Sequence, residues 1–165
     1  ARENIVCREL FAKYPTCEAL ASAEYSDIEE IIRPCGLFRT KARQIKEMSK
    51  ILVRDFGGEV PADKEVLLTL PGVGEKIANL MMGDVFGDPH IVADTHLIRL
   101  TGRFGLTESK NPAVVTREME ALVPKKEQSD FCHRIVYHGR AVCDARAPKC
   151  EMCCVKHVCK TFSGT

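Results

Sequence analysis

Apolar side chains recur at the spacing of an α-helix along most of the chain, and the alternation typical of strands is nearly absent. The clearest amphipathic segment is 38–56, which Gly57 and Gly58 end. Further helices are predicted over 1–13, about 28–33, 63–69, 75–86, 94–104, from 111–112 onward, and about 126–140. The pattern therefore predicts an all-α protein.

Polar residues mark the start of several of these helices. Ser26 or Asp27 can cap the helix near residue 28, and Asn111 followed by Pro112 supplies an N-cap with a proline at the first helical position. In the first helix, the residues that we expect on one, core-facing side are Ile5, Leu10 and Phe11.

Length and composition are those of a folded protein with no bulk charge. The 165 residues suffice for one generous domain or two small ones. The formal net charge is only +1, so any nucleic-acid surface has to come from a local arrangement of cations. No apolar run approaches the length of a membrane span, and the N-terminus has no apolar signal core.

Nine cysteines are many for this length, and five of them fall within the last 23 residues. This clustering favours a metal or cluster site in a reducing compartment over a disulfide scaffold, so we expect an intracellular protein. The remaining four stand singly in helical patterns, and we expect buried structural thiols at Cys7, Cys17, Cys35 and Cys132.

The clustered cysteines form the pattern C-x6-C-x2-C-x5-C. Four thiolates in one short loop can converge on a tetrahedral zinc ion or on an iron–sulfur cluster, and the spacing alone leaves both open. Cys154 and His157 also lie in the loop and can in principle replace one of the ligands. The four residues of the pattern are Cys143, Cys150, Cys153 and Cys159.

The stretch LPGVGEKIANL, residues 70–80, places two glycines in a tight turn before a helix. Its spacing does not match the G-x4-G-K-[ST] phosphate loop, and a preceding helix in place of a strand excludes the dinucleotide fingerprint. A helix–turn–helix hairpin remains, in which Gly72 and Gly74 allow a ligand to approach the backbone and the next helix start can hold a phosphate. A plain connection between two helices is the alternative.

Lys76 follows this turn, in the first turn of the next helix, where the helix dipole disfavours a cation. Most such lysines are simply solvated. In a partly enclosed cleft, however, the dipole and desolvation favour the neutral amine, which can attack a sugar C1′. Asp94 is a good N-cap for the helix after it, and an ionised carboxylate there can also stabilise an oxocarbenium-like sugar.

Three segments together resemble the endonuclease III family of DNA glycosylases, in the helix-hairpin-helix superfamily. LPGVGEKIAN is similar to the hairpin of that family, VADTHLIRL to its catalytic-aspartate segment, and HGRAVCDARAPKCEMCCVKHVC to its [4Fe–4S] loop. Their order and separation agree with the family, as do GLFRTKARQI and GGEVP. The family normally carries further N-terminal helices and an S-A-Q-x-T-D-like loop, which are absent from this sequence, and a proline where Cys154 stands.

The resemblance implies a helical barrel domain over 1–88, N-terminally incomplete, that contains the helix-hairpin-helix at about 63–83. It implies a second, iron–sulfur domain over 89–165 with its cluster loop at 143–159, and an active site in the cleft between the domains. By the same resemblance, Lys76 is the amine nucleophile, Asp94 the carboxylate, and the four loop cysteines bind a [4Fe–4S] cluster. The residues expected to contact DNA are Gly72, Val73 and Gly74 in the hairpin and, from the local charge, Arg140, Arg146 and Lys149.

The implied function is base excision with β-elimination at the abasic site. The lysine favours this bifunctional reaction, because relatives that remove mismatched adenine generally lack it and use water. The expected partner is double-stranded DNA with damaged pyrimidines or abasic sites, bound by a monomer without a membrane. For a bacterial source, we expect a cytoplasmic, nucleoid-associated protein. A monofunctional mismatch glycosylase and a non-catalytic iron–sulfur DNA-binding module are the alternatives.

Overall fold

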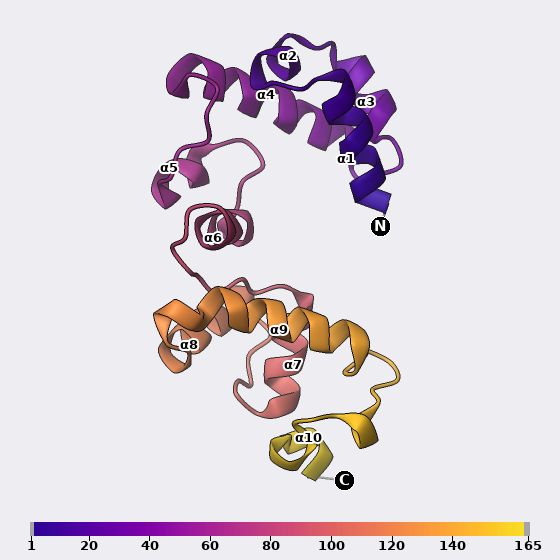
Figure 1. Cartoon of the computed structure of the whole chain (residues 1–165), viewed down its shortest axis with the longest axis vertical. Coiled ribbons are helices and arrows are strands. Elements are labelled where there is room, and N and C mark those ends of the chain that lie inside the picture. The colour runs from indigo at the N-terminus through magenta and orange to yellow at the C-terminus, as the bar shows by residue number, and fades with distance from the viewer. Residues whose placement is uncertain (1, 164–165) are drawn as a thin grey trace. The chain divides into compact units, whose positions relative to one another are not determined.

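The computed structural model describes residues 2–163, and over that range it consists of helices and connecting turns without a strand (Figure 1). The all-α fold class is therefore confirmed. The chain forms two compact units, Ala1–Gly74 and Glu75–Thr165. The two domains predicted over 1–88 and 89–165 stay a prediction. Across the described residues, no helix has both the length and the hydropathy needed to cross a membrane.

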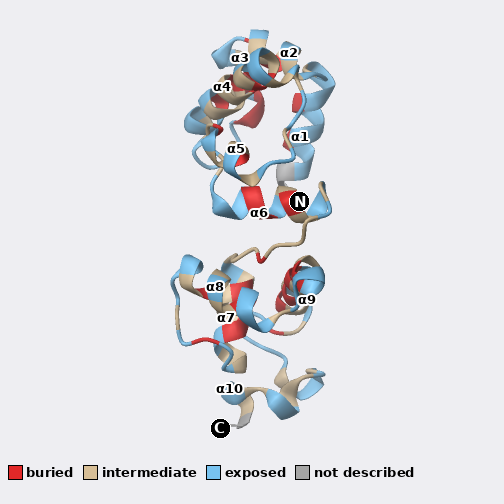
Figure 2. Ribbon diagram, turned by 90° about the vertical axis from the view of Figure 1, so that its left-hand side faces the viewer, coloured by how far each residue is buried: buried red, intermediate tan, exposed pale blue. Residues whose placement is uncertain are grey.

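The first unit is built on its longest helix. Helices α2 and α3 pack on α4, and α1 packs on α3. Ala42 of α4 is fully buried in a core made mostly of aliphatic residues, and Figure 2 shows the buried residues of these helices in red. The helices of this unit are α1 (Arg2–Lys13), α2 (Cys17–Ser22), α3 (Tyr25–Ile32), α4 (Phe38–Phe56) and α5 (Lys64–Thr69).

Two expectations for the first helix are wrong. Val6 and Leu10, one helical turn apart, face the core, whereas Ile5 is 69% exposed and Phe11 57% exposed. Cys7 is also exposed, because its side chain lies outside the face of α1 that carries Val6 and Leu10. Tertiary contacts with α3 select the face that is buried, and the apolar pattern of this helix allowed more than one choice.

The predicted cap of α3 is also wrong, and α2 was missed. The helix begins one residue after Glu24, without a side-chain cap. Asp27 instead pairs with Lys13 at 3.2 Å and accepts a hydrogen bond from Tyr14, and the Lys13 contact lowers the pKa of this carboxyl. The six-residue helix α2 is capped by Thr16, whose hydroxyl accepts from the amide of Ala19. Thr16 is thus the sequence signal that could have revealed it.

The second unit surrounds a core between α7, α8 and α9. Helix α9 packs on α7 and on α6, and α10 packs on α7. Buried residues of this core include Ile91, Leu97, Leu100, Met119 and Ile135. The helices are α6 (Glu75–Asp84), α7 (Thr95–Phe104), α8 (Pro112–Leu122), α9 (Gln128–Ala141) and α10 (Lys160–Ser163), with 3-10 turns η1 (Lys125–Glu127), η2 (Cys150–Met152) and η3 (Lys156–Val158).

Helix α6 ends at Asp84, two residues before the predicted end. Gly87, with φ of 72°, turns the chain, and the amide of Asp88 bonds back to the carbonyl of Met82. The buried Asn79 then donates its amide to the carbonyl of Ile91 at 2.8 Å. This bond ties α6 to the segment that leads into α7, and so helps to place Asp94.

Candidate functional site

The hairpin between α5 and α6 contains a type II turn. The amide of Val73 bonds to the carbonyl of Leu70 at 3.1 Å, Pro71 occupies the second position and Gly72, with φ of 82°, the third. A Cβ at Gly72 would also lie 2.9 Å from the side-chain carbon Cδ of Gln44. The fold therefore requires glycine at this position.

Two other predicted contacts in the hairpin have different surroundings. A Cβ at Gly74 would meet no atom within 4 Å, so the fold itself does not demand glycine there. A ligand that approaches the backbone closely would account for a glycine at this position. The N–H of Val73 is already bonded within the turn, so a phosphate at Val73 would have to share that donor.

The structure brings Lys76 and Asp94 to one cavity of about 320 Å³. Lys76 lies on the first turn of α6, is exposed, and forms no hydrogen bond or ion pair with any described residue. Asp94 caps α7: its Oδ1 accepts from the amide of Leu97 at 2.8 Å. Its second carboxylate oxygen has no partner in the described part of the chain, and it is therefore available to a ligand.

Two helices supply most of this cavity, which we call the α6–α9 cavity. From α6 come residues spaced by four, which share one face of the helix. From α9 come residues along the stripe that faces α6. The residues that line the cavity are Lys76, Leu80, Asp84, Val92, Asp94, Ser129, Cys132, His133, Val136, Tyr137 and Arg140.

Close packing fixes how the two helices meet. A Cβ at Gly83 would lie 2.2 Å from the hydroxyl of Ser129, so α6 and α9 touch at this glycine. Next to it, Asp84 Oδ2 lies 3.2 Å from His133 Nε2. Cys132 is buried, and burial together with the nearby carboxylates raises the pKa of its thiol.

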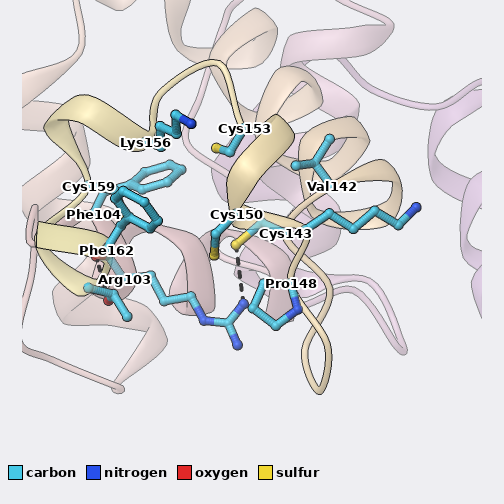
Figure 3. A pocket seen from close by; sticks show the side chains of 12 residues that line it. Arg103, Phe104, Val142, Cys143, Pro148, Cys150, Cys153, Lys156, Cys159 and Phe162 are labelled. Atoms are coloured by element: carbon cyan, nitrogen blue, oxygen red, sulfur yellow. Dashed lines mark hydrogen bonds between the residues drawn. The ribbon is translucent and has the colours of Figure 1, made fainter. Parts of the chain in front are cut away.

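The four cysteines of the loop line a second cavity of about 180 Å³ (Figure 3). Cys143 follows α9, and the other three come from the turns around η2 and η3. None of them is in a disulfide bond. Cys154 and His157 do not line this cavity, so the structure singles out the four residues of the spacing pattern.

The chemistry of the donor set fits an iron–sulfur cluster, because four cysteines line one cavity and none of them is in a disulfide bond. The same four thiols are also a ligand set for zinc.

Arg103 supports this loop from α7. Its guanidinium donates to the carbonyl oxygens of Asp144 and Ala145, at 2.7 and 2.8 Å, and to Cys143 Sγ at 3.2 Å (Figure 3). Cys153 Sγ lies 3.4 Å from the Nε2 atom of His138. These contacts fix the position of two of the four cysteines.

The three predicted cationic contacts lie in different places. Arg140 lines the α6–α9 cavity, and Lys149 lines the cysteine cavity while its Nζ donates to the carbonyl of Ala141 at 3.2 Å. Arg146 is exposed in the turn that Asp144 organises by accepting from its amide. Contact of these residues with DNA stays a prediction.

Of the α9 residues that line the cavity, sequence reasoning named Arg140 but missed His133 and Tyr137, and it also missed Asp84 on α6. These three residues carry no motif, and their place at the site follows only from the packing of α6 on α9. A weak signal was available, because Leu80 and Asp84 follow Lys76 at intervals of four on the same helix.

Comparison with known proteins agrees with this geometry. Residues 1–125 match the family of HhH-GPD superfamily base excision DNA repair proteins. The chain is 43% identical to the endonuclease III of Synechocystis sp. over 165 residues, which cover 99% of this chain and 75% of the relative. It also matches the structure of a non-covalent endonuclease III–DNA complex and that of a trapped covalent endonuclease III–DNA intermediate. Each match has a TM-score of 0.91 and 36% identity, and each covers 98% of this chain and 76% of the other.

The hairpin, the lysine and aspartate at one cavity, and the cysteine loop all lie in the aligned region. Together with these matches they show that the chain belongs to the endonuclease III family of HhH-GPD base excision DNA repair proteins.

Proposed function

We propose that this chain is a DNA glycosylase with abasic-site lyase activity, which removes oxidised or ring-damaged pyrimidines from duplex DNA. The observation that carries the proposal is the unpaired amine of Lys76 at the same cavity as the free oxygen of Asp94. The family assignment and the DNA complexes of its relatives support the coarser part, a DNA glycosylase.

The proposed chemistry uses both groups. The Lys76 amine attacks C1′ of the extruded nucleotide, the N-glycosidic bond breaks, and the base leaves with its bonding electron pair and takes up a proton. The free oxygen of Asp94 stabilises the positive charge that develops on the sugar. The amine then loses a proton and the C1′–O4′ bond breaks, with O4′ taking up the electron pair and a proton, which opens the sugar ring and gives the Schiff base. Loss of a C2′ proton sends electrons toward C3′, and the C3′–O bond breaks in β-elimination, with the 3′ phosphate leaving with its bonding electron pair. The trapped covalent endonuclease III–DNA intermediate of a related protein supports a covalent bond between protein and DNA in this reaction.

DNA would be held through its backbone. The open space at Gly74 lets a phosphate approach the hairpin, and Arg140 lies at the cavity where a phosphate next to the extruded sugar would pass. Arg146 and Lys149 add positive charge from the cysteine loop. Such contacts give affinity that falls with salt, without sequence preference.

The four loop cysteines are the proposed ligands of a [4Fe–4S] cluster. When bound, this cluster would supply four iron–thiolate bonds that hold the loop over 143–159 folded. Arg103 would fix the loop from outside through its two carbonyl contacts. The loop would thus present Arg146 and Lys149 on a rigid frame.

Borohydride trapping tests the proposal directly. The purified holoprotein is mixed with a duplex that carries one thymine glycol, and covalent protein–DNA adduct is measured with and without borohydride. We expect adduct with the unsubstituted protein, none with Lys76→Gln, and normal adduct with Lys126→Gln, which removes a lysine outside both cavities. Absence of adduct together with strand cleavage would overturn the Schiff base.

The same assay separates the alternatives. Base release without adduct would identify a monofunctional glycosylase, and binding without base release a non-catalytic iron–sulfur module. The monomeric state and the intracellular location stay predictions.

A further inference from the structure

The α9 side of the α6–α9 cavity carries features that the proposed chemistry leaves unused. Tyr137 is 70% exposed, an unusual exposure for an aromatic side chain at a cavity. Its hydroxyl has no hydrogen-bond partner among the described residues, so neither burial nor bonding explains its place. Leu80, on α6, is a second apolar side chain there, and it is 40% exposed.

A polar pair lies on the same helices. In the 3.2 Å contact of the pair, the carboxylate of Asp84 accepts and His133 Nε2 donates. The other ring nitrogen, Nδ1, has no partner within the described part of the chain. The pair is partly exposed and lines the cavity, so it can present this nitrogen to a ligand.

Helix geometry orders these features along the cavity. At a rise of 1.5 Å per residue, Leu80 lies about 6 Å and Asp84 about 12 Å along α6 from Lys76. On α9, His133 and Tyr137 are four residues apart and share one face. The nucleophile thus stands at one end of α6, the polar pair at the other, and apolar side chains lie in between.

We propose that this face of α9 recognises the extruded base, with Tyr137 stacked on the ring and His133, held by Asp84, hydrogen-bonded to its edge. This rests on the proposed function, which places C1′ of the nucleotide at Lys76. A base attached at C1′ then extends along α6 toward the polar pair. A base stacks well on an aromatic ring, and an unpaired ring nitrogen can pair with a donor or acceptor on the base.

The other charged and titratable groups at this cavity come from α6, from α9 and from the segment that leads into α7. Asp84 contacts His133 directly, Cys132 is buried, and Lys76 lies two helical turns from Asp84 along α6. The full set that lines the cavity is Lys76, Asp84, Asp94, Cys132, Tyr137 and Arg140. Among the described residues, none of them forms a hydrogen bond or ion pair with His133 Nδ1, which leaves that atom to the substrate.

Two duplexes that differ only in the presence of a base test this proposal. One carries thymine glycol and the other a preformed abasic site, and single-turnover cleavage of each is measured with the holoprotein. Tyr137→Ala is expected to reduce the rate with thymine glycol by about 5- to 150-fold, because a stacked base is lost. Cleavage of the abasic duplex is expected to stay within about twofold, since that substrate has no base to stack.

Conservative variants separate recognition from structure. Tyr137→Phe keeps the ring and is expected to restore activity with the base, and His133→Gln to retain more of it than His133→Leu. Leu122→Ala, which removes an exposed apolar side chain outside both the α6–α9 cavity and the cysteine cavity, is the control. Equal losses on both duplexes, or no loss on either, would overturn the inference.

Failure of the proposed glycosylase–lyase function is distinguished from failure of base recognition by a binding measurement. If the unsubstituted protein cleaves neither duplex, binding is compared in the Lys76→Gln background between thymine glycol and a tetrahydrofuran abasic analogue. Loss of a preference for the base-containing duplex on Tyr137→Ala supports recognition by α9 independently of chemistry. No change in that preference removes it.

Discussion

Asp94 has two separable roles, and substitution can tell them apart. Its Oδ1 caps α7 through the 2.8 Å bond from the amide of Leu97, and the residue also lines the α6–α9 cavity. Asparagine is as good an N-cap as aspartate, but carries no charge. Alanine removes the cap and the charge together.

The structure gives the expected magnitudes. Asp94→Ala loses a cap worth about 1 kcal/mol and a charge–dipole interaction worth about 0.3–1 kcal/mol, whereas Asp94→Asn loses only the second. For a chain of this size, 1 kcal/mol shifts Tm by about 2–4 °C. The alanine variant should therefore melt about 3–8 °C lower, and the asparagine variant about 1–4 °C lower.

The loss of excision activity in the two variants should not parallel their loss of thermal stability. Both variants lose the carboxylate that faces the sugar, so base release from a thymine glycol duplex should fall by about 10²–10³-fold in each. Calorimetric melting and single-turnover base release, measured on the same holoprotein preparations, check this. Asparagine activity within tenfold of the unsubstituted protein would show that the charge is not needed. Equal melting of the two variants would refute the capping role.

Three further outcomes follow from single contacts. Asn79→Ala should lower the free energy of unfolding by about 1–3 kcal/mol in urea titrations, because the buried carbonyl of Ile91 loses its donor. Cys132 should react with maleimide about tenfold or more slowly than the exposed Cys7 at pH 8, by peptide mass spectrometry, since burial raises its pKa and its thiolate forms only at higher pH. Equal rates would contradict that burial. Arg103→Gln should speed iron loss to a chelator severalfold by absorbance, because the loop loses its carbonyl contacts; an unchanged rate would show that the cluster alone holds the loop.

Much of the helical framework is encoded locally. Helix α4 runs over 38–56 as predicted, because its apolar period is long and two glycines end it. Asp94 and Asn111 cap the helices predicted for them, since capping needs only a side chain two or three residues from an amide. The cysteine spacing likewise named the four residues that share a cavity.

Where the local sequence is compatible with several buried faces or helix starts, tertiary packing decides which one forms. The buried face of α1, the start of α3 and the exposure of Cys7 depend on which neighbour each helix meets, and periodicity carries no such information. The same holds for the α9 side of the site. His133 and Tyr137 reach the cavity of Lys76 only because Gly83 lets α6 touch α9, a contact between residues far apart in the chain. The sequence by itself thus determined most of the helices, the hairpin and the candidate residues Lys76, Asp94 and the four loop cysteines, whereas non-local packing alone decided which side chains surround Lys76.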